Sequence, residues 1–462
     1  MKRARALAVT ACVLAACLAA AAPASAQAAW PPLPGDSPLE KSPEANDIRV
    51  RTWDELLGAP RTAAQAFERR TESNAWGRWS VYVDRSGTGS GDAFYTVFSP
   101  ERGGAWPQYA QGSWIVKRSR ADGSFMQAKV FLRSDPQTFA RIYPFGDRSL
   151  LDVVAYGGVL YREVIIPLSF EAVLRSPFSR VRQLTADVVD WSPFSPEPAL
   201  YGGLRALADS IRPLLPGLRY ADDGAIDHDG RAVRIADLGA QGPEPGLNCS
   251  GFAKWLVDGT LAPLTGSYLR VDALRERMID WRGSSFTVKF EEKYDPFFGL
   301  DWARALATAA WSALYPSRRE ESPLAWDVSE PPFALIVRDA DPVNGGGAYR
   351  PYSANFDDAG FELPGLKAVL FSLASREPGR YYLAQFSARK PVEPHLRTWF
   401  HLAALFPYFD TDGVFRVAVF ESAEETSLDR IMGDPDYEFV KLVRMPVSGR
   451  FSPQALEASA AP

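Results

Sequence analysis

The sequence predicts an α+β protein whose N-terminal half is a mainly antiparallel β domain. Three observations support this fold class. Residues 76–195 hold many short segments that are rich in aromatic and β-branched residues and separated by Gly, Asp and Ser turns. In the rest of the chain, stretches with helical periodicity come first and strand-like stretches follow. A cluster of Pro and Ser at 190–203 marks a boundary between the two patterns.

The first 26 residues have the features of an export signal. They combine a basic start, an apolar run over 6–22 and a small-residue cleavage pattern. Cleavage after Ala26 would release a soluble protein, whereas lipoprotein processing at Cys17 would leave a lipid anchor on that cysteine. The apolar run is short for an uncleaved membrane span. We therefore expect an exported protein of the periplasm or cell envelope.

Charge and composition limit the partners of the exported part. The chain has 51 basic and 56 acidic residues, and three of the basic ones lie in 1–26, which leaves a net charge of −8. A mildly acidic surface argues against nucleic acid as the main partner. Three histidines and one retained cysteine are too few for a zinc site, and the Gly-rich stretch at 87–92 lacks the Lys-Ser/Thr of a phosphate loop. We expect no metal and no cofactor.

The elements before residue 200 are expected to be an extended leader followed by strands. Residues 27–75 are rich in Pro and polar residues, which predicts a leader lying on the surface. The domain assigned to 76–195 is predicted to contain strands at 76–84, 93–99, 112–118, 125–132, 138–145, 150–158 and 160–168.

The domain assigned to 200–462 is predicted to combine helices with a sheet. Helices are expected at 203–215, 249–259, 299–315 and 365–378. Strands are expected at 333–339, 380–388, 398–409, 414–422 and 437–447.

The stretch "GLNCSGFAKWLVDG" at 246–259 holds the only cysteine outside the signal segment. Asn248 is a good helix N-cap, and Cys249 opens an apolar face with helical spacing. A thiol in the first helical turn lies beside free backbone N–H groups, which favour a thiolate and can hold an oxyanion. The same pattern also fits a small buried cysteine, so a partner base must decide between the two.

His401 is the candidate base. His228 lies in the turn "IDHDG" and His395 follows a proline, so both are expected in exposed loops. His401 instead lies inside the apolar strand predicted at 398–409. An ionisable ring is unusual there unless it has a hydrogen-bond partner or a functional role. A core histidine satisfied by a hydrogen bond is the alternative.

A carboxylate on the next strand could orient this histidine. A three-residue loop at 411–413 would make Glu421 the diagonal neighbour of His401, and a five-residue loop would place them directly opposite. A two-residue loop would bring Glu424 opposite His401 instead. Gln241, eight residues before the cysteine, is a further candidate donor to an oxyanion.

These motifs resemble those of a known family. "NCSGFAKWLVDG", "HLAALFPYF" and "FRVAVFES" are similar to the Asp-Cys-Ser-Gly helix start, the histidine strand and the following strand of NlpC-type cell-wall cysteine peptidases, in the papain-like superfamily. The resemblance covers only these motifs in the C-terminal half. It implies a papain-like domain in which a cysteine at a helix N-terminus packs on an antiparallel sheet that carries the histidine. Cys249 would be the nucleophile, His401 the base and Glu421 the orienting residue.

The sequence departs from the family pattern in three places. Asn248 replaces the usual Asp, and Glu421 stands where His, Asn or Gln is commoner. Cys249 and His401 are 152 residues apart, so the helix predicted at 299–315 must be an insertion or a different elaboration of the core.

The resemblance implies an exported hydrolase that cleaves an amide bond in a peptide or in peptidoglycan. The same residues could pass the acyl group to an amine instead of water. The alternative from another class is a non-catalytic envelope protein that uses the scaffold for binding or structure.

Overall fold

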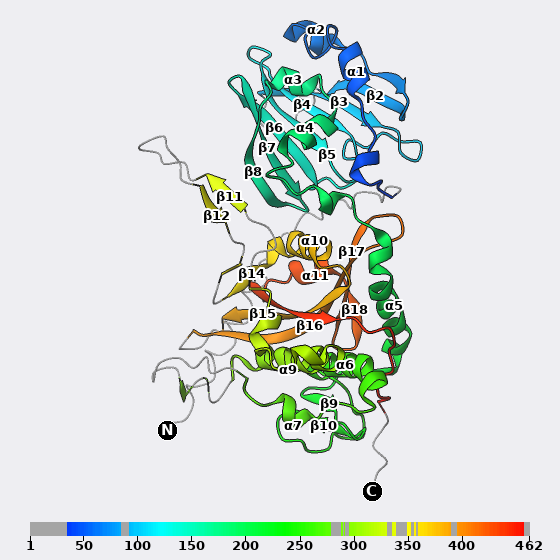
Figure 1. The fold of residues 1–462 in the computed structure, drawn as a ribbon, viewed down its shortest axis with the longest axis vertical. Coiled ribbons are helices and arrows are strands. Elements are labelled where there is room, and N and C mark those ends of the chain that lie inside the picture. The colour runs from blue at the N-terminus through cyan, green and yellow to red at the C-terminus, as the bar shows by residue number, and fades with distance from the viewer. Residues whose placement is uncertain are drawn as a thin grey trace, which may run out of the picture.

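Two antiparallel sheets dominate the structure (Figure 1). The computed structural model describes residues 35–84, 92–278, 295–329, 359–389 and 395–456, with short segments at 288–289, 291, 335–338, 349–352 and 355–356. The predicted α+β class and the N-terminal antiparallel β domain are confirmed. The export signal at 1–26, with Cys17, lies outside the described residues.

The N-terminal sheet is an up-and-down meander of eight strands, each paired with the next in sequence. The strands are β1 (Arg70–Asn74), β2 (Gly77–Asp84), β3 (Ala93–Pro100), β4 (Trp114–Ser119), β5 (Phe125–Phe131), β6 (Phe139–Phe145), β7 (Arg148–Ala155) and β8 (Gly158–Ile166). β2 to β8 correspond to the seven predicted strands. Two short helices, α3 (Phe170–Leu174) and α4 (Phe178–Thr185), follow the sheet.

The segment before β2 differs from the extended leader that its composition predicts. Its described part forms η1 (Leu39–Lys41), α1 (Asn46–Arg51), α2 (Arg61–Ala66) and β1. Ile48 and Leu56 are fully buried in the core of the N-terminal sheet. A few apolar side chains among the prolines and charges are enough to dock short helices, because each buried side chain contributes about 1.5–3 kcal/mol.

The Pro- and Ser-rich boundary is packed. It forms η2 (Ser192–Phe194) and η3 (Pro198–Tyr201), and these lead into α5 (Gly202–Ile211) and η4 (Arg212–Gly217). Phe194 and Tyr201 are buried, and the Tyr201 hydroxyl donates to the carbonyl of Ala374 at 2.9 Å. The boundary therefore joins the two halves firmly.

The C-terminal sheet has seven strands in the order β13-β14-β19-β15-β16-β17-β18, all antiparallel. Their bounds are β13 (Asn355–Phe356), β14 (Gly360–Glu362), β15 (Arg380–Arg389), β16 (Arg397–Phe409), β17 (Phe415–Glu421), β18 (Glu424–Thr426) and β19 (Phe439–Pro446). Four predicted strands correspond to β15, β16, β17 and β19. The strand predicted at 333–339 forms β11 (Leu335–Arg338), which pairs with β12 (Tyr349–Tyr352) in a separate hairpin.

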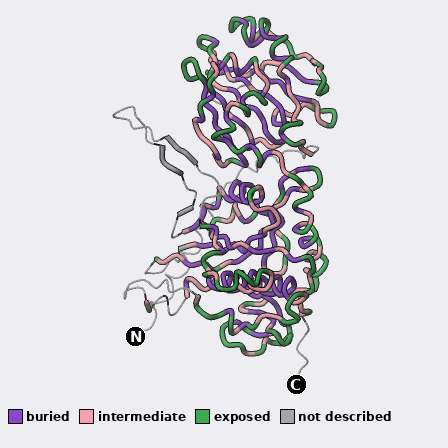
Figure 2. Tube along the Cα trace, in the orientation of Figure 1, coloured by how far each residue is buried: buried purple, intermediate pink, exposed green. Residues whose placement is uncertain are grey.

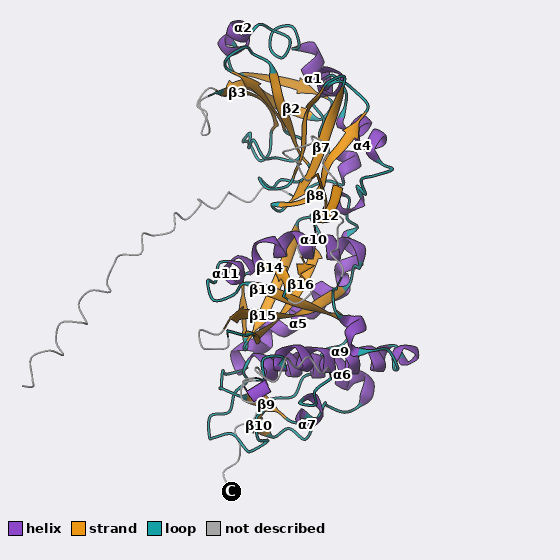
Figure 3. Cartoon of the chain, turned by 90° about the vertical axis from the view of Figure 1, so that its left-hand side faces the viewer, coloured by secondary structure: helices purple, strands orange, loops and turns teal. Residues whose placement is uncertain are grey.

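Helices cover both faces of this sheet (Figures 1 and 3). α6 (Cys249–Thr265) and α9 (Phe298–Leu314) lie on one face, and α10 (Leu366–Arg376) and α11 (Leu428–Met432) lie on the other. Trp302 and Leu306 of α9 are fully buried in the core that α9 shares with α6. The helix predicted at 299–315 is therefore an integral part of the core, not a peripheral insertion.

The two sheets share one hydrophobic core. It runs from the N-terminal sheet to the face of the C-terminal sheet that carries α10, and Figure 2 shows the buried chain on both sides of the junction. Phe371 of α10 contacts Tyr156 and Phe194, with ring centroids 5.3 and 5.5 Å apart. Within the described residues, no helix is both long enough and apolar enough to cross a bilayer.

Candidate active site

The predicted helix start is present, and its cap is formed. α6 begins at Cys249, and the Asn248 side chain accepts a hydrogen bond from the N–H of Gly251 at 2.8 Å. The indole of Trp302 donates to the Ser250 carbonyl at 3.0 Å and so ties this turn to α9. Within the described part of the chain, the N–H groups of Cys249 and Ser250 have no hydrogen-bond partner. These two donors and the helix dipole favour an anion beside the thiol.

Glycines let the helix start sit closely on the hairpin of β9 (Gly224–Ile226) and β10 (Ala232–Arg234). A Cβ at Gly251 would meet the carbonyl of Gly224, and a Cβ at Gly224 would meet the carbonyl of Gly246; both would be closer than 3.0 Å. The N–H of Asn248 donates to the Gly224 carbonyl at 3.0 Å. The hairpin thus fixes where the first turn of α6 lies.

Gln241 holds the same region together and is not available as an oxyanion donor. Its Nε2 donates to the carbonyls of Ala225, Val233 and Gly246 at 2.9–3.1 Å. Its Oε1 accepts from the N–H of Gly246 at 2.8 Å. The expectation that Gln241 could serve an oxyanion is wrong, because its amide is fully used by backbone groups.

The thiol lies against the open edge of β16. The Sγ of Cys249 is 3.9 Å from the carbonyl oxygen of Phe400. β17 ends at Glu421, and its pairing with β16 begins only at Ala404. Within the described residues no strand pairs with β16 beyond that point, and Cys249 lies there.

His401 and Glu421 are in direct contact. The Nε2 of His401 and the Oε2 of Glu421 are 2.5 Å apart. Asp410 pairs with Val414 across the loop 411–413, which confirms the three-residue loop and the diagonal placement. Because Nε2 is engaged by the carboxylate, Nδ1 is the ring nitrogen left for the thiol.

Glu424, the reserve candidate, pairs with an arginine and not with the histidine. Its side chain is 56% exposed, and Oε1 pairs with Arg430 at 3.4 Å. The loop length therefore selects Glu421 over Glu424.

Two aromatic rings fix the plane of the imidazole. Tyr437 stacks on His401 with centroids 5.5 Å apart and an angle of 10°. Phe386 lies 6.1 Å from the imidazole at 35°, and it also stacks on Tyr437. The sequence reasoning missed Tyr437, because its place near the start of a predicted strand carries no functional signal.

Cys249 and His401 shift each other's pKa. Burial raises the pKa of the Cys249 thiol, but the hydrogen bond and the charge of His401 more than reverse this, and the net pKa is lowered. Burial lowers the pKa of His401, yet its hydrogen bonds with Cys249 and Glu421 outweigh this and raise the pKa to about 9. Both shifts favour a thiolate next to an imidazolium at neutral pH.

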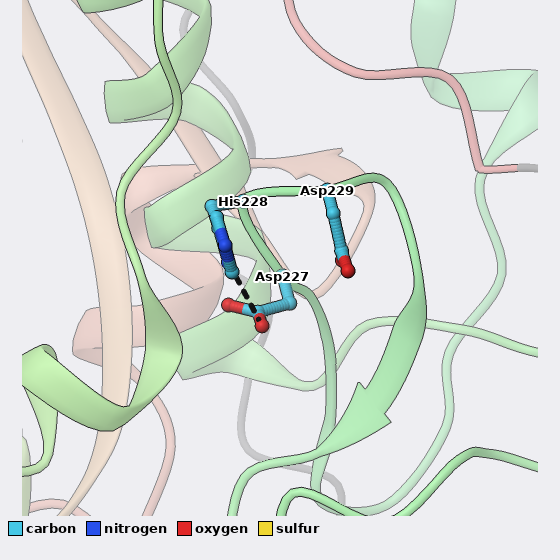
Figure 4. A group of neighbouring side chains, drawn as sticks. All are labelled: Asp227, His228 and Asp229. Atoms are coloured by element: carbon cyan, nitrogen blue, oxygen red, sulfur yellow. Dashed lines mark ion pairs between the residues drawn. The ribbon is translucent and has the colours of Figure 1, made fainter.

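The other histidines lie outside this site. His228 is on the exposed turn that the sequence predicts, and its Nδ1 is 3.0 Å from Asp227 (Figure 4). Its ligand atoms and those of Asp227 and Asp229 lie within 4.8 Å of one another. Asp227 already accepts from the Val271 N–H, and Asp229 pairs with Arg231, so this turn gives no specific support for a metal. His395 is exposed.

Comparison with known proteins covers only the N-terminal half. A family model described as "Domain of unknown function (DUF8515)" matches residues 38–193. That stretch spans the N-terminal sheet and the helices beside it, and it contains none of the three candidate residues. No curated protein and no solved structure matches the chain.

Proposed function

We propose that this protein is an exported cysteine hydrolase that cleaves an amide bond in a peptide or in peptidoglycan. Residues 200–462 then form a papain-like domain with Cys249 as nucleophile, His401 as base and Glu421 as orienting residue. One observation carries the proposal: a thiol at a capped helix start lies beside an imidazole whose far nitrogen is held by a carboxylate at 2.5 Å.

The geometry supports a two-step reaction. The Cys249 thiolate attacks the amide carbonyl, and the C–N bond breaks as the His401 imidazolium gives its proton to the leaving amine. The neutral imidazole then takes a proton from water, which attacks the thioester and releases the acid. Glu421 holds the ring in one orientation and stabilises its charged form throughout.

Backbone donors of α6 support the oxyanion that forms in both steps. The N–H groups of Cys249 and Ser250, which have no partner among the described residues, lie in the first helical turn. Removing one such donor in other enzymes costs about 10²–10³ in kcat.

The location of the activity is part of the proposal. An export signal at 1–26 would place the enzyme in the periplasm or cell envelope, with a lipid anchor on Cys17 if processing occurs there. An enzyme in that compartment meets wall peptides and not cytoplasmic substrates.

Alkylation of the thiol tests the site without a known substrate. We expect iodoacetamide to modify Cys249 with a pH inflection below that of an ordinary thiol, about 8.5. In His401→Ala the inflection should rise, because the imidazolium no longer stabilises the thiolate. An ordinary inflection that the substitution leaves unchanged would favour the non-catalytic envelope protein.

Turnover tests the reaction class. Purified peptidoglycan and wall-derived peptides are incubated with the protein, and newly released amino groups are counted. Cys249→Ala should abolish release, and His401→Ala should lower it by roughly 10²–10⁴. The proposal fails if Cys249→Ala releases amines as fast as the unmodified protein.

A further inference from the structure

A row of contacting rings leads from the proposed base to the protein surface. The ring of Tyr437 lies on the imidazole of His401, with centroids 5.5 Å apart, and it also contacts the ring of Phe400 at 5.7 Å and 45°. The Phe400 side chain is 47% exposed, although Trp399 and Leu402 near it in β16 are buried. The outermost ring of this row is therefore accessible from solvent, and the innermost ring is the group that would transfer a proton.

A β-bulge explains how two consecutive residues of β16 reach the same tyrosine. Successive residues of a strand normally point to opposite faces of the sheet. The pairing of β15 with β16 skips Phe400, which is therefore the extra residue of a bulge. A bulge redirects side chains, and here the rings of Phe400 and His401 both contact Tyr437. The carbonyl oxygen of Phe400 also lies 3.9 Å from the Sγ of Cys249, so the bulge is at the thiol itself.

The position of these rings relates them to one side of the scissile amide. In the proposed reaction, the sulfur of Cys249 bonds to the acyl carbon, and His401 gives its proton to the nitrogen of the leaving amine. That nitrogen must therefore lie beside the imidazole, where the surface formed by Tyr437 and Phe400 begins. The residue that follows the scissile bond brings its side chain to the same place.

We propose, on the basis of the hydrolase function proposed above, that Phe400 selects substrates with an aromatic or large aliphatic side chain on the amine side of the scissile bond. This side chain packs on the exposed ring of Phe400, which removes apolar area of both groups from water. The C–N bond breaks, the nitrogen takes the proton of His401, and a residue with such a side chain becomes a new N-terminus. A small side chain such as that of alanine buries little of the ring and makes a poorer substrate.

The N-termini released from a peptide mixture test this selectivity without a known substrate. The exported chain is incubated with a randomised synthetic peptide library whose N-termini are acetylated, and the residues that carry the new amino groups are identified by sequencing. We expect Phe, Tyr, Trp and Leu to be enriched about tenfold over Ala, because partial burial of an apolar side chain contributes enough free energy for that factor. Phe400→Ala should lose most of this enrichment.

Phe145→Ala is the matched control. Phe145 is 49% exposed but lies in β6 of the N-terminal sheet, so its loss should leave the enrichment unchanged. Phe400→Ala should still fold, because about half of the side chain that it removes is exposed. Alkylation of Cys249 with a pH inflection still below that of an ordinary thiol checks that His401 faces the sulfur in this variant.

An added amine tests the same surface in the reverse direction. When an amine replaces water, its nitrogen attacks the thioester, its proton passes to His401, and the Cys249 thiolate leaves. Phenylalaninamide should therefore intercept the acyl-enzyme about tenfold more efficiently than alaninamide. Phe400→Ala should remove most of this difference. Equal interception by the two amines in the unmodified protein would overturn the inference.

The outcomes separate this inference from the function on which it rests. If neither peptides nor peptidoglycan release amines in a Cys249-dependent way, the hydrolase function fails and the inference falls with it. If release depends on Cys249 but shows no aromatic or aliphatic enrichment, or if Phe400→Ala keeps the enrichment, only the inference is overturned. Enrichment of lysine would overturn it as well, since Asp434 and Asp436, just before Tyr437 in the chain, would then select a cation.

Discussion

At the scale of single residues, the site depends on what holds the His401 ring. Glu421 binds one nitrogen of the ring at 2.5 Å, and Tyr437 stacks on its face at 10°. The carboxylate acts on the charge of the ring, whereas the tyrosine acts on its orientation. Substitutions can separate these two effects.

Glu421→Gln should move the alkaline limb of the pH–rate profile. The charge of Glu421 helps to raise the pKa of His401 to about 9, so neutralising it lowers that pKa. In the proposed reaction the imidazolium is the acid that protonates the leaving amine, so kcat/KM should begin to fall at a lower pH than in the unmodified protein. Glu424→Gln is the control, since Glu424 pairs with Arg430 and should leave the profile unchanged. An identical shift in both variants would argue against a direct role of Glu421.

Tyr437→Ala should lower kcat/KM, whereas Tyr437→Phe should not. Phenylalanine keeps the ring that stacks on His401, and alanine removes it. A mispositioned base typically costs about tenfold or more in rate, so we expect roughly that loss in kcat at pH 7. Equal loss in both variants would show that the hydroxyl matters and not the stacking. The pH inflection for alkylation of Cys249 reports on the stacking of Tyr437 on His401 without depending on turnover.

The sequence could indicate which residues matter but not how they meet. The capped helix start and the isolated strand histidine have local signatures, so Cys249 and His401 could be identified from spacing. The choice between Glu421 and Glu424 could not be made, because it depends on whether the turn has two or three residues. The role of Gln241 was predicted wrongly and Tyr437 was not identified, because both roles depend on contacts that the local sequence does not show.

At the scale of elements, α6 needs glycine where it meets β9. Gly251→Ala places a Cβ against the backbone carbonyl of Gly224, which cannot move as a side chain can. We expect a loss of about 1–3 kcal/mol in the free energy of unfolding, measured by urea titration, together with reduced activity. Gly203→Ala in α5 is the control, because the nearest atom lies 3.7 Å from its Cβ; it should be neutral or slightly stabilising. Similar effects of both substitutions would contradict the packing argument.

The buried ion pair inside α6 should be costly to break from one side. Lys254 and Asp258 are each 1% exposed and 2.5 Å apart. Lys254→Met leaves the carboxylate buried without a counter-charge, with only the Leu269 N–H still donating to it, so we expect a loss of about 3–5 kcal/mol in the free energy of unfolding. Arg234→Ala is the control: it breaks the exposed pair between Arg234 of β10 and Asp237, and it should leave the free energy of unfolding nearly unchanged.

The loss caused by Lys254→Met should depend on pH. Burial raises the pKa of Asp258 even with Lys254 present, although Lys254 opposes this. A carboxyl whose folded pKa is raised destabilises the fold as pH rises through that pKa. Lys254→Met should therefore be least harmful in acid. A loss that stays constant between acid and neutral pH would show that Asp258 is not the cause.

Regular elements were easier to predict than irregular ones. In β2 to β8, apolar residues alternate with polar ones or form continuous stretches. In α6, α9 and α10, apolar residues recur with helical spacing. The short helices before β1 were missed because each is shorter than two turns and has few apolar residues. They form by docking on the sheet, and local sequence does not show a docking surface.

At the scale of the whole molecule, the two sheets should unfold as one unit. The sequence pattern divides the chain near residue 195, but one core runs across that boundary. Phe194 is fully buried and contacts Phe371 on the C-terminal side, with centroids 5.5 Å apart. A shared core of this kind couples the stabilities of the two halves.

Hydrogen exchange in two matched variants tests this coupling. Phe194→Ala removes a buried ring at the junction, and Phe94→Ala removes an equally buried ring from the small cluster that Phe94 forms with Ala59 and Ala64 beside the N-terminal sheet. Each should cost about 3–5 kcal/mol. Because Phe194 packs on α10, its loss should speed exchange in β17 as well as in β8. Phe94 belongs to a separate cluster, so its effect should be largest in β3. If Phe194→Ala leaves exchange in β17 unchanged, the halves unfold independently, and the hairpin that carries His401 and Glu421 does not depend on the N-terminal sheet.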